Sequence, residues 1–222
     1  MLSDEATLHE LGIKHHTDKA THHCFTVLYD YWLSPIRAKP IRMLEIGILL
    51  GGSLRMWYEY FWQAERIYAA DILMPEERNA PAVTLGSYVE LLRLDQTNRK
   101  QLRNMPSNLD LIIDDGGHTM EQQQLTLVEL FSHLKPGGTY ILEDLHTSYP
   151  EYAETHGCTP ENNTLQLLLD LQQSKFNENS EYFISKVEFN WLLLQLRDIE
   201  IVRVKDQSIT ARIRKKTSFC FV

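Results

Sequence analysis

Apolar and polar residues alternate along this chain in blocks that predict strands and helices in turn. Five apolar or β-branched runs have the length of buried strands: residues 41–46, 66–70, 89–94, 109–113 and 139–142. Between them we expect helices at 51–61, at 97–105 with Thr97 as N-cap, and at 119–134, which the Lys-Pro-Gly-Gly run at 135–138 ends; residues 75–81 form a charged loop or broken helix. Near-continuous apolar strands separated by helices predict a parallel sheet covered on both faces.

The pattern changes in the last third of the chain. Residues 165–176 predict a helix, and residues 182–194 predict a further element packed beside it. Two alternating runs, 199–204 and 209–213, are separated by residues 205–208. A connection this short joins antiparallel neighbours. We therefore expect an α/β fold whose seven-stranded, mostly parallel sheet ends in an antiparallel hairpin.

The first forty residues stand outside the alternation of strands and helices. We expect residues 1–40 to form a helical cap and residues 41–222 the main domain, within one compact unit. Residues 21–33 predict a helix whose aromatic side chains pack on the sheet, or serve as a lid or as the interface of a homo-oligomer. Residues 14–19 are too polar for a core, so we expect a surface loop there, or a flap over the active site.

Composition narrows the class of partner. The formal net charge is −8 over 222 residues, so we expect no large basic face and no nucleic-acid partner. None of the three cysteines belongs to a CxxC pair, which argues against zinc-knuckle and redox motifs. The N-terminus does not resemble a signal peptide, and the apolar runs are shorter than a membrane span. These features favour a cytoplasmic protein that binds a small molecule and no membrane.

A glycine-rich turn follows the first predicted strand, in the run Leu-Glu-Ile-Gly-Ile-Leu-Leu-Gly-Gly-Ser at 44–53. Gly47 permits a tight turn and the close approach of a ligand to the backbone. Gly51, Gly52 and Ser53 open the next helix, whose free N–H groups suit an anionic group. The turn matches neither GxGxxG nor GxxxxGK[ST], so by itself it is as compatible with a structural turn or an NAD site.

Polar side chains at the ends of the next two strands sharpen this interpretation. Asp71 ends the second strand, where a carboxylate can accept both ribose hydroxyls of an adenosine. Asp95 and Gln96 end the third strand, where side chains usually face the adenine. Each acid alone could be an N-cap or a solvated loop residue. Together with the glycine turn, they favour an adenosyl cofactor such as S-adenosylmethionine (SAM).

A cluster of acids and imidazoles follows the fourth and fifth strands. Asp114, Asp115 and His118 come after one strand, and Glu143 and Asp144 after its expected neighbour. Carboxylates so close repel one another unless a cation or protons offset the charge. Oxygen ligands suit a hard ion such as Mg²⁺ or Mn²⁺, which could hold two substrate hydroxyls. The alternative, that these acids cap the following helices, fits Asp114 or Asp115 singly, but no obvious helix follows Glu143 and Asp144.

Histidines near the acids could move a proton. His118 lies on the turn into a helix, where an imidazole could accept the proton of a hydroxyl, or could be a solvated or orienting residue. His146 is the competing base or a substrate contact. Tyr149 fits packing as well as catalysis.

These motifs resemble two related families. The segments that carry the resemblance are LEIGxxxGGSLxxW (44–57), DDGGH (114–118), KPGG (135–138), EDLHTSY (143–149) and TDKATHH (17–23). They are similar to the Mg²⁺-dependent sugar O-methyltransferases of macrolide biosynthesis and to the cephalosporin-hydroxylase-like proteins. The resemblance covers about residues 14 to 152 and implies the Rossmann-like fold of class I methyltransferases, with five parallel strands and a terminal hairpin.

The resemblance also implies roles for individual residues. It makes Asp115, Glu143 and Asp144 metal ligands, His118 the general base, Glu45, Gly47, Asp71 and Asp95 SAM contacts, and Asp114 a neighbour of the methionyl end of SAM. The chain is shorter than the macrolide enzymes and lacks their additional N-terminal domain, and residues 150–163 match no substrate loop of these families. The acceptor therefore stays open.

Three functions follow from these expectations. The first is a SAM- and metal-dependent O-methyltransferase that acts on a hydroxyl of a small molecule such as a sugar or a glycosylated metabolite. The second is a SAM-binding partner protein without activity, of the cephalosporin-hydroxylase-like type. The third is a nucleotide-binding oxidoreductase, which would need a dinucleotide loop that the sequence does not show.

Overall fold

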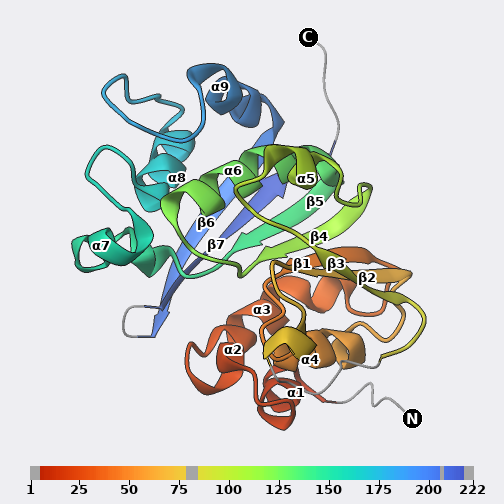
Figure 1. Ribbon diagram of the computed structural model, residues 1–222. Coiled ribbons are helices and arrows are strands. Elements are labelled where there is room, and N and C mark those ends of the chain that lie inside the picture. Colours follow the sequence, from red (N-terminus) through yellow and green to blue (C-terminus); the bar gives the residue numbers. More distant parts are fainter. Residues whose placement is uncertain (1–5, 79–84, 206–207, 218–222) are drawn as a thin grey trace.

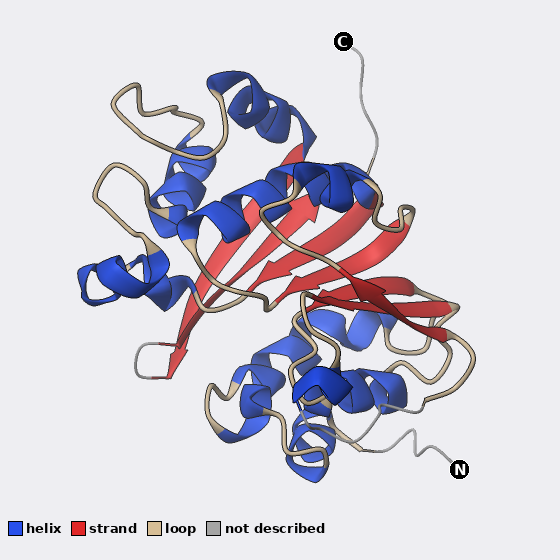
Figure 2. Cartoon of the chain, viewed as in Figure 1, coloured by secondary structure: helices blue, strands red, loops and turns tan. Residues whose placement is uncertain are grey.

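A seven-stranded sheet forms the middle of the protein, with helices on both faces (Figures 1 and 2). The computed structural model describes residues 6–78, 85–205 and 208–217. The strand order is β3-β2-β1-β4-β5-β7-β6. The first five strands are parallel, and β7 runs antiparallel to both β5 and β6. The predicted sheet with its terminal hairpin is confirmed.

The strand positions follow the apolar runs closely. The strands are β1 (Arg42–Ile46), β2 (Arg66–Asp71), β3 (Val89–Arg93), β4 (Leu109–Asp114), β5 (Leu134–Leu142), β6 (Leu196–Lys205) and β7 (Ser208–Lys215). The order reverses between β1 and β4, so the carboxyl ends of the parallel strands meet at one edge beside a topological switch point. Two residues of the connection predicted at 205–208, and part of the segment 75–81, lie outside the described residues.

Helices divide between the two faces. The α-helices are α1 (Leu8–Lys14), α2 (Asp18–Thr21), α3 (Phe25–Leu33), α4 (Gly52–Tyr60), α5 (Arg99–Arg103), α6 (Met120–Leu130), α7 (Ala153–His156), α8 (Thr164–Gln173) and α9 (Lys186–Gln195). Short 3-10 helices are η1 (Ser34–Ile36), η2 (Pro75–Arg78), η3 (Phe131–His133), η4 (Leu145–Ser148) and η5 (Pro150–Tyr152). Figure 1 shows α1, α3 and α4 on one face and α5, α6, α8 and α9 on the other.

Each face has its own hydrophobic core. One cluster joins the inner sides of α6, α8 and α9 to the sheet through residues such as Leu127, Leu168 and Phe189. The other joins α1, α3 and α4 to the opposite face through Leu11, Tyr29 and Trp57. The N-terminal helices therefore share a core with the sheet. Among the described residues, no helix is both long and apolar enough to cross a bilayer.

The structure corrects several predicted boundaries. Asn98, not Thr97, caps α5, because its side chain accepts a hydrogen bond from Gln101 N. The helix predicted over 119–134 ends at Leu130, and residues 135–138 lie within β5. The Lys215 ammonium donates to the carbonyls of Phe131 and Leu134, which stabilises the early end of that helix.

The N-terminal helix is also interrupted. Residues 21–33 were expected to form one helix, but α2 ends at Thr21 and α3 begins at Phe25. Cys24 between them adopts a left-handed conformation with φ of 58°, which a continuous helix cannot accommodate. The break lets the polar segment before it turn toward the carboxyl edge of the sheet.

Candidate active site

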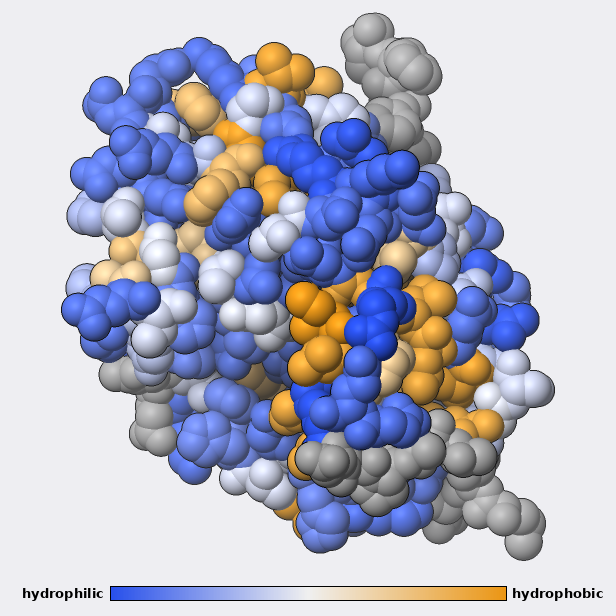
Figure 3. Space-filling model, viewed as in Figure 1, coloured by the Kyte–Doolittle hydropathy of each residue, from blue (hydrophilic) through white to orange (hydrophobic). Residues whose placement is uncertain are grey.

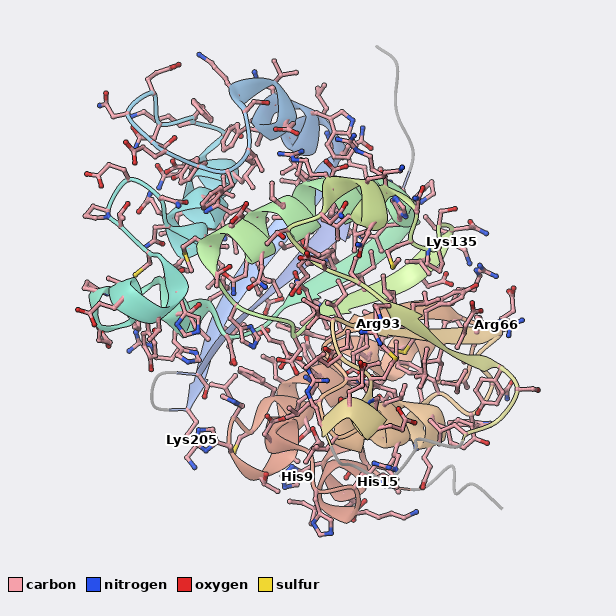
Figure 4. All side chains as sticks on the ribbon, viewed as in Figure 1. His9, His15, Arg66, Arg93, Lys135 and Lys205 are labelled. Carbon is pink, nitrogen blue, oxygen red and sulfur yellow. The ribbon has the colours of Figure 1, made fainter. Side chains whose placement is uncertain are left out.

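A cavity of about 530 Å³ opens at the carboxyl ends of the parallel strands. Its wall comes from four regions: the N-terminal residues 15–18, the glycine turn at 46–53, the ends of β2 and β3, and the turns after β4 and β5. In Figure 4, His15 lies among the N-terminal helices, whereas Arg66 and Lys135 mark the distant starts of β2 and β5. The cavity therefore lies where ligands bind in open α/β sheets.

Gly47 makes the tight turn after β1 possible. Its φ is +92°, and a Cβ placed there would come within 1.9 Å of the Asp115 carbonyl oxygen. The turn thus packs directly on the one after β4. Gly51 also has positive φ, at 78°, and stands at the N-cap of α4. Gly52 and Ser53 line the cavity at the start of that helix, as predicted for the cofactor turn, while Gly51 lies behind them.

Asp71 lies on the cavity wall and shapes the glycine turn. One carboxylate oxygen accepts hydrogen bonds from Ile48 N at 2.8 Å and Leu49 N at 3.1 Å. The other accepts from Leu73 N and from the Arg78 guanidinium, at 3.1 and 2.8 Å. Burial alone would raise the pKa of Asp71, but these donors outweigh it and lower the pKa. Asp71 is therefore an ionised carboxylate on the cavity wall.

After β3, the amide side chain of Gln96 lines the cavity, whereas the carboxylate of Asp95 does not. Gln96 lines the cavity, and its amide donates to Asp114 at 2.8 Å while its oxygen accepts from Gly117 N at 2.8 Å. Asp95 accepts from Thr97 N and closes a local turn. Of these described residues, the cavity wall includes Gln96 but neither Asp95 nor Asp114.

Asp114 is a buried support between two strands. Its second oxygen accepts from the Tyr140 hydroxyl at 2.7 Å, and the residue is 1% exposed. Burial raises the pKa of Asp114 to about 6, against the lowering effect of these donors. Asp114 therefore holds Gln96 in place from behind the wall.

Glu45 lies deeper than the expected cofactor contact. It is fully buried within β1, and Trp57 Nε1 donates to its Oε1 at 2.8 Å. Its Oε2 has no hydrogen-bond partner among the described residues. Burial raises the pKa of Glu45 to about 7. The cavity wall does not include Glu45.

Three predicted residues converge at the other end of the cavity. Asp115, His118 and Asp144 each offer a ligand atom, and these atoms lie within 4.8 Å of one another. His118 Nε2 is 3.7 Å from Asp115 Oδ1 and 3.5 Å from Asp144 Oδ2. His118 and Asp144 both have left-handed backbones, with φ of 59° and 54°. Strained residues that gather at one point indicate a functional site.

Asp144 does not cap a helix with its side chain. The 3-10 helix η4 does begin immediately after it, which the sequence did not predict, but the Asp144 side chain makes no cap hydrogen bond. Its Oδ1 is buried and has no hydrogen-bond partner among the described residues. Two more imidazole nitrogens, from His23 and His146, lie 3.7 Å from that oxygen. Burial lowers the pKa of His146. A buried carboxyl oxygen without a hydrogen-bond donor is suited to bind a cation.

Lys19 is a site residue to which the sequence analysis assigned no role. The segment 14–19 was expected at the surface, yet Lys19 is 0% exposed. Its ammonium contacts Asp115 and lies 3.0 Å from Glu143 Oε1 and 4.0 Å from Glu45 Oε1. Burial alone would lower the pKa of Lys19, but the three carboxylates hold it well above the usual range. The neighbouring residues 15–18 line the cavity, as the flap alternative expected.

The structure also places the remaining predicted residues. Glu143 is buried beside Lys19 and does not line the cavity, while Asp115 and Asp144 do. The Tyr149 hydroxyl contacts Arg203. Figure 3 shows hydrophilic residues over most of one face and an apolar area near its middle. Two turns that line the cavity also expose apolar side chains, from Leu49 and Leu50 and from Ile72.

Comparison with known proteins is consistent with this geometry. A methyltransferase domain family matches residues 44–145. A tetracenomycin rhamnosyl 2'-O-methyltransferase of Streptomyces olivaceus is 33% identical over 149 residues, which are 63% of this chain and 38% of that protein. The corresponding 3'-O-methyltransferase of the same organism is 33% identical over 183 residues, covering 73% and 44%.

A solved structure matches nearly the whole chain. The MycE methyltransferase in complex with Mg, S-adenosylhomocysteine and mycinamycin VI superposes with a TM-score of 0.73 and 25% identity, over 96% of this chain and 56% of that one. The chain thus spans about two fifths of the curated relatives and about half of the solved one. The chain thus has the fold of the class I methyltransferases, its residues 44–145 match a methyltransferase domain family, and its sequence is similar to those of two rhamnosyl-tetracenomycin O-methyltransferases.

Proposed function

We propose that this chain is a SAM- and divalent-metal-dependent O-methyltransferase that acts on a hydroxyl of a small molecule, namely a sugar or a glycosylated metabolite. The observation that carries the proposal is one cavity with two ends. The glycine turn and Asp71 line one end, and Asp115, His118 and Asp144 line the other. Methyl transfer requires that the methyl donor and the hydroxyl held by the metal lie next to each other.

The residues of the first end fit SAM. The turn at Gly47 has no room for a side chain, and Gly52 and Ser53 present the start of α4 to the cavity. We expect Asp71 to accept the ribose hydroxyls and Gln96 to lie beside the base. Glu45, Asp95 and Asp114 support this end from behind the wall. SAM supplies a methyl group that is already electrophilic, so the protein's work there is binding and orientation.

The residues of the second end fit a hard cation such as Mg²⁺ or Mn²⁺. Buried oxygens of Asp144 and Glu143 lack hydrogen-bond partners among the described residues, and carboxylate oxygens are what such ions prefer. We assign Asp115, Glu143 and Asp144 as the ligands; Glu143 would have to turn from Lys19. A divalent ion bound there supplies positive charge that orients hydroxyl oxygens and lowers their pKa.

We assign His118 as the general base. Its imidazole lines the cavity, and its Nε2 lies beside Asp115 and Asp144. That nitrogen can accept the proton of a hydroxyl held between these carboxylates, and they then stabilise the imidazolium. The described part of the predicted cap, residues 6–40, covers the domain in this proposal, because residues 15–18 close one wall. The names of the matched relatives support a sugar as the acceptor.

Isothermal titration tests the proposal. SAM is titrated into chelator-treated protein with and without Mg²⁺, and methyl transfer to a panel of glycosylated metabolites is measured. Asp115→Ala and Glu143→Ala should abolish turnover and leave SAM affinity largely unchanged, since both lie at the metal end. Equal loss of SAM affinity in both variants would contradict the metal role. Tight SAM binding without transfer to any acceptor would favour a non-catalytic partner protein.

A further inference from the structure

Lys19 is a charged side chain held wholly inside the protein by the proposed metal ligands. Its ammonium contacts Asp115 Oδ2 and lies 3.0 Å from Glu143 Oε1. A third carboxylate, that of Glu45, lies 4.0 Å away. The proposed reaction gives this lysine no role. Burying an ammonium is costly, and three acidic neighbours offset that cost.

Lys19 divides the acidic cluster into two parts. Asp115 turns Oδ2 to the lysine, while its Oδ1 faces His118 at 3.7 Å, on the cavity side. Glu143 keeps Oε1 beside the lysine, although that approach lacks hydrogen-bond geometry. A metal ion held by Asp115, Glu143 and Asp144 would therefore share two of its three ligands with an ammonium group.

We propose that Lys19 is a positioning residue that acts as an internal counter-cation of the metal site. It holds Asp115 and Glu143 together before the ion binds, and it competes with the ion for their oxygens. This role rests on the metal site proposed above. Its consequence is a site that is preformed but binds Mg²⁺ more weakly than its carboxylates alone would.

Other contacts fix the segment around Lys19, so the charge can be removed without removing the wall. Lys14 Nζ lies 2.7 Å from Glu59 Oε2, and His15 Nε2 lies 2.8 Å from Glu59 Oε1. Thr17 N donates to the Gly12 carbonyl at 3.1 Å. A substitution at position 19 therefore tests the charge rather than the path of the backbone.

Calorimetric titration of Mg²⁺ into chelator-treated protein tests this role without measuring turnover. Lys19→Met should bind Mg²⁺ roughly tenfold more tightly or better, because a cation within contact distance of the ligands is lost. Lys19→Arg keeps the charge and should stay within about threefold of the unaltered chain. Lys14→Met is the matched control: it also removes a lysine paired with a glutamate, outside the cluster, and should leave Mg²⁺ affinity unchanged.

Unchanged or weaker Mg²⁺ binding by folded Lys19→Met would overturn the role of Lys19 and leave the metal site intact. Absence of saturable Mg²⁺ binding by the unaltered chain would overturn the metal site and this role with it. If Lys19→Met does not fold, ¹⁵N-lysine NMR of the unaltered chain decides the matter. The Lys19 ammonium resonance, identified by its loss in Lys19→Arg, should shift as Mg²⁺ saturates the site. A resonance that does not respond at saturation overturns the competition.

Discussion

The two ends of the cavity are built on different principles. At the glycine-turn end, the polar groups satisfy one another: Asp71 accepts four hydrogen bonds, and Gln96 joins Asp114 to Gly117. At the acidic end, Asp144 Oδ1 and Glu143 Oε1 are buried without hydrogen-bond partners among the described residues. On the cavity wall, the glycine-turn end satisfies its polar groups within the protein, whereas the acidic end leaves Asp144 Oδ1 without a donor.

This difference predicts that the glycine-turn end binds its ligand with little rearrangement and that binding at the acidic end depends on a metal ion. Hydrogen bonds within the protein hold the glycine-turn end in the shape that a ligand meets, which reduces the entropy lost on binding. The acidic end gains most of its favourable interactions only when a cation is bound. We therefore expect substitutions at the two ends to separate SAM affinity from metal dependence and from turnover.

The largest expected effect is at His118. His118→Ala should lower the rate of methyl transfer by about 10²- to 10⁴-fold, the usual contribution of a general base, and should leave SAM affinity unchanged. Single-turnover kinetics and calorimetry measure the two quantities. His22→Ala is the control, because it removes an exposed imidazole next to His23 and should leave both quantities unchanged. Loss of Mg²⁺ binding in His118→Ala would instead make His118 a metal ligand.

Gly47→Ala tests the rigidity of the other end. We expect a loss of about 3 kcal/mol or more in the free energy of unfolding, because the methyl group meets a backbone carbonyl and φ is positive. Chemical denaturation measures the loss. Gly157→Ala is the matched control, since Gly157 has φ of +68° but nothing within 4 Å of a Cβ. Its cost should be about 1 kcal/mol. Equal costs at both positions would show that the clash relaxes.

Asp114 lies between the two ends of the cavity, and its raised pKa predicts how stability changes with pH. A pKa raised to about 6 means that the folded state binds this proton more tightly than the unfolded state, whose carboxyl has an ordinary pKa. That contribution to stability is complete below the unfolded pKa and is lost as pH rises through about 6. The stability of Asp114→Asn relative to the unaltered chain should therefore improve between pH 4 and 7, by about 1 to 3 kcal/mol. A flat difference across that range contradicts the raised pKa of this buried carboxyl.

The smallest expected effect is at Arg78. This guanidinium lines the cavity and donates to Asp71 Oδ1, so it competes for the carboxylate proposed to bind the ribose. Its side chain is 22% exposed, so the ion pair itself contributes little to stability. Arg78→Ala should tighten SAM binding by about two- to fivefold, as measured by calorimetry, because one competitor for Asp71 is removed. Arg93→Ala, which removes a neighbouring exposed arginine, should not. Weaker SAM binding in Arg78→Ala would mean that the guanidinium helps to hold the cofactor.

The sequence predicted the features that depend on neighbouring residues. Strands, the glycine turn and the acids at strand ends follow from short apolar runs and their polar ends, and the structure brings Asp115, His118 and Asp144 together as expected. One boundary was wrong because a distant residue decides it. The helix predicted to reach residue 134 ends early beside Lys215, which arrives from the last strand.

Lys19 shows the same limit within the site. In the sequence it ends the polar run 14–19, a composition that is typical of the surface, and nothing in that run indicates burial. Its partners come from the ends of three separate strands, so only the assembled sheet makes its position favourable. The roles of Asp71 and Asp114 were incomplete for a related reason: sequence position shows that an acid ends a strand, but not which donors its oxygens meet.

His118 and Asp144 keep left-handed backbones that glycine would adopt at no steric cost. Each left-handed backbone lowers the stability of the fold by about 1 kcal/mol. In return, an imidazole and a carboxylate stand at the same edge of the sheet. Selection for thermal stability alone should therefore enrich glycine or asparagine at these two positions. Selection for turnover should oppose these substitutions, so variants that gain stability at these two positions should lose activity.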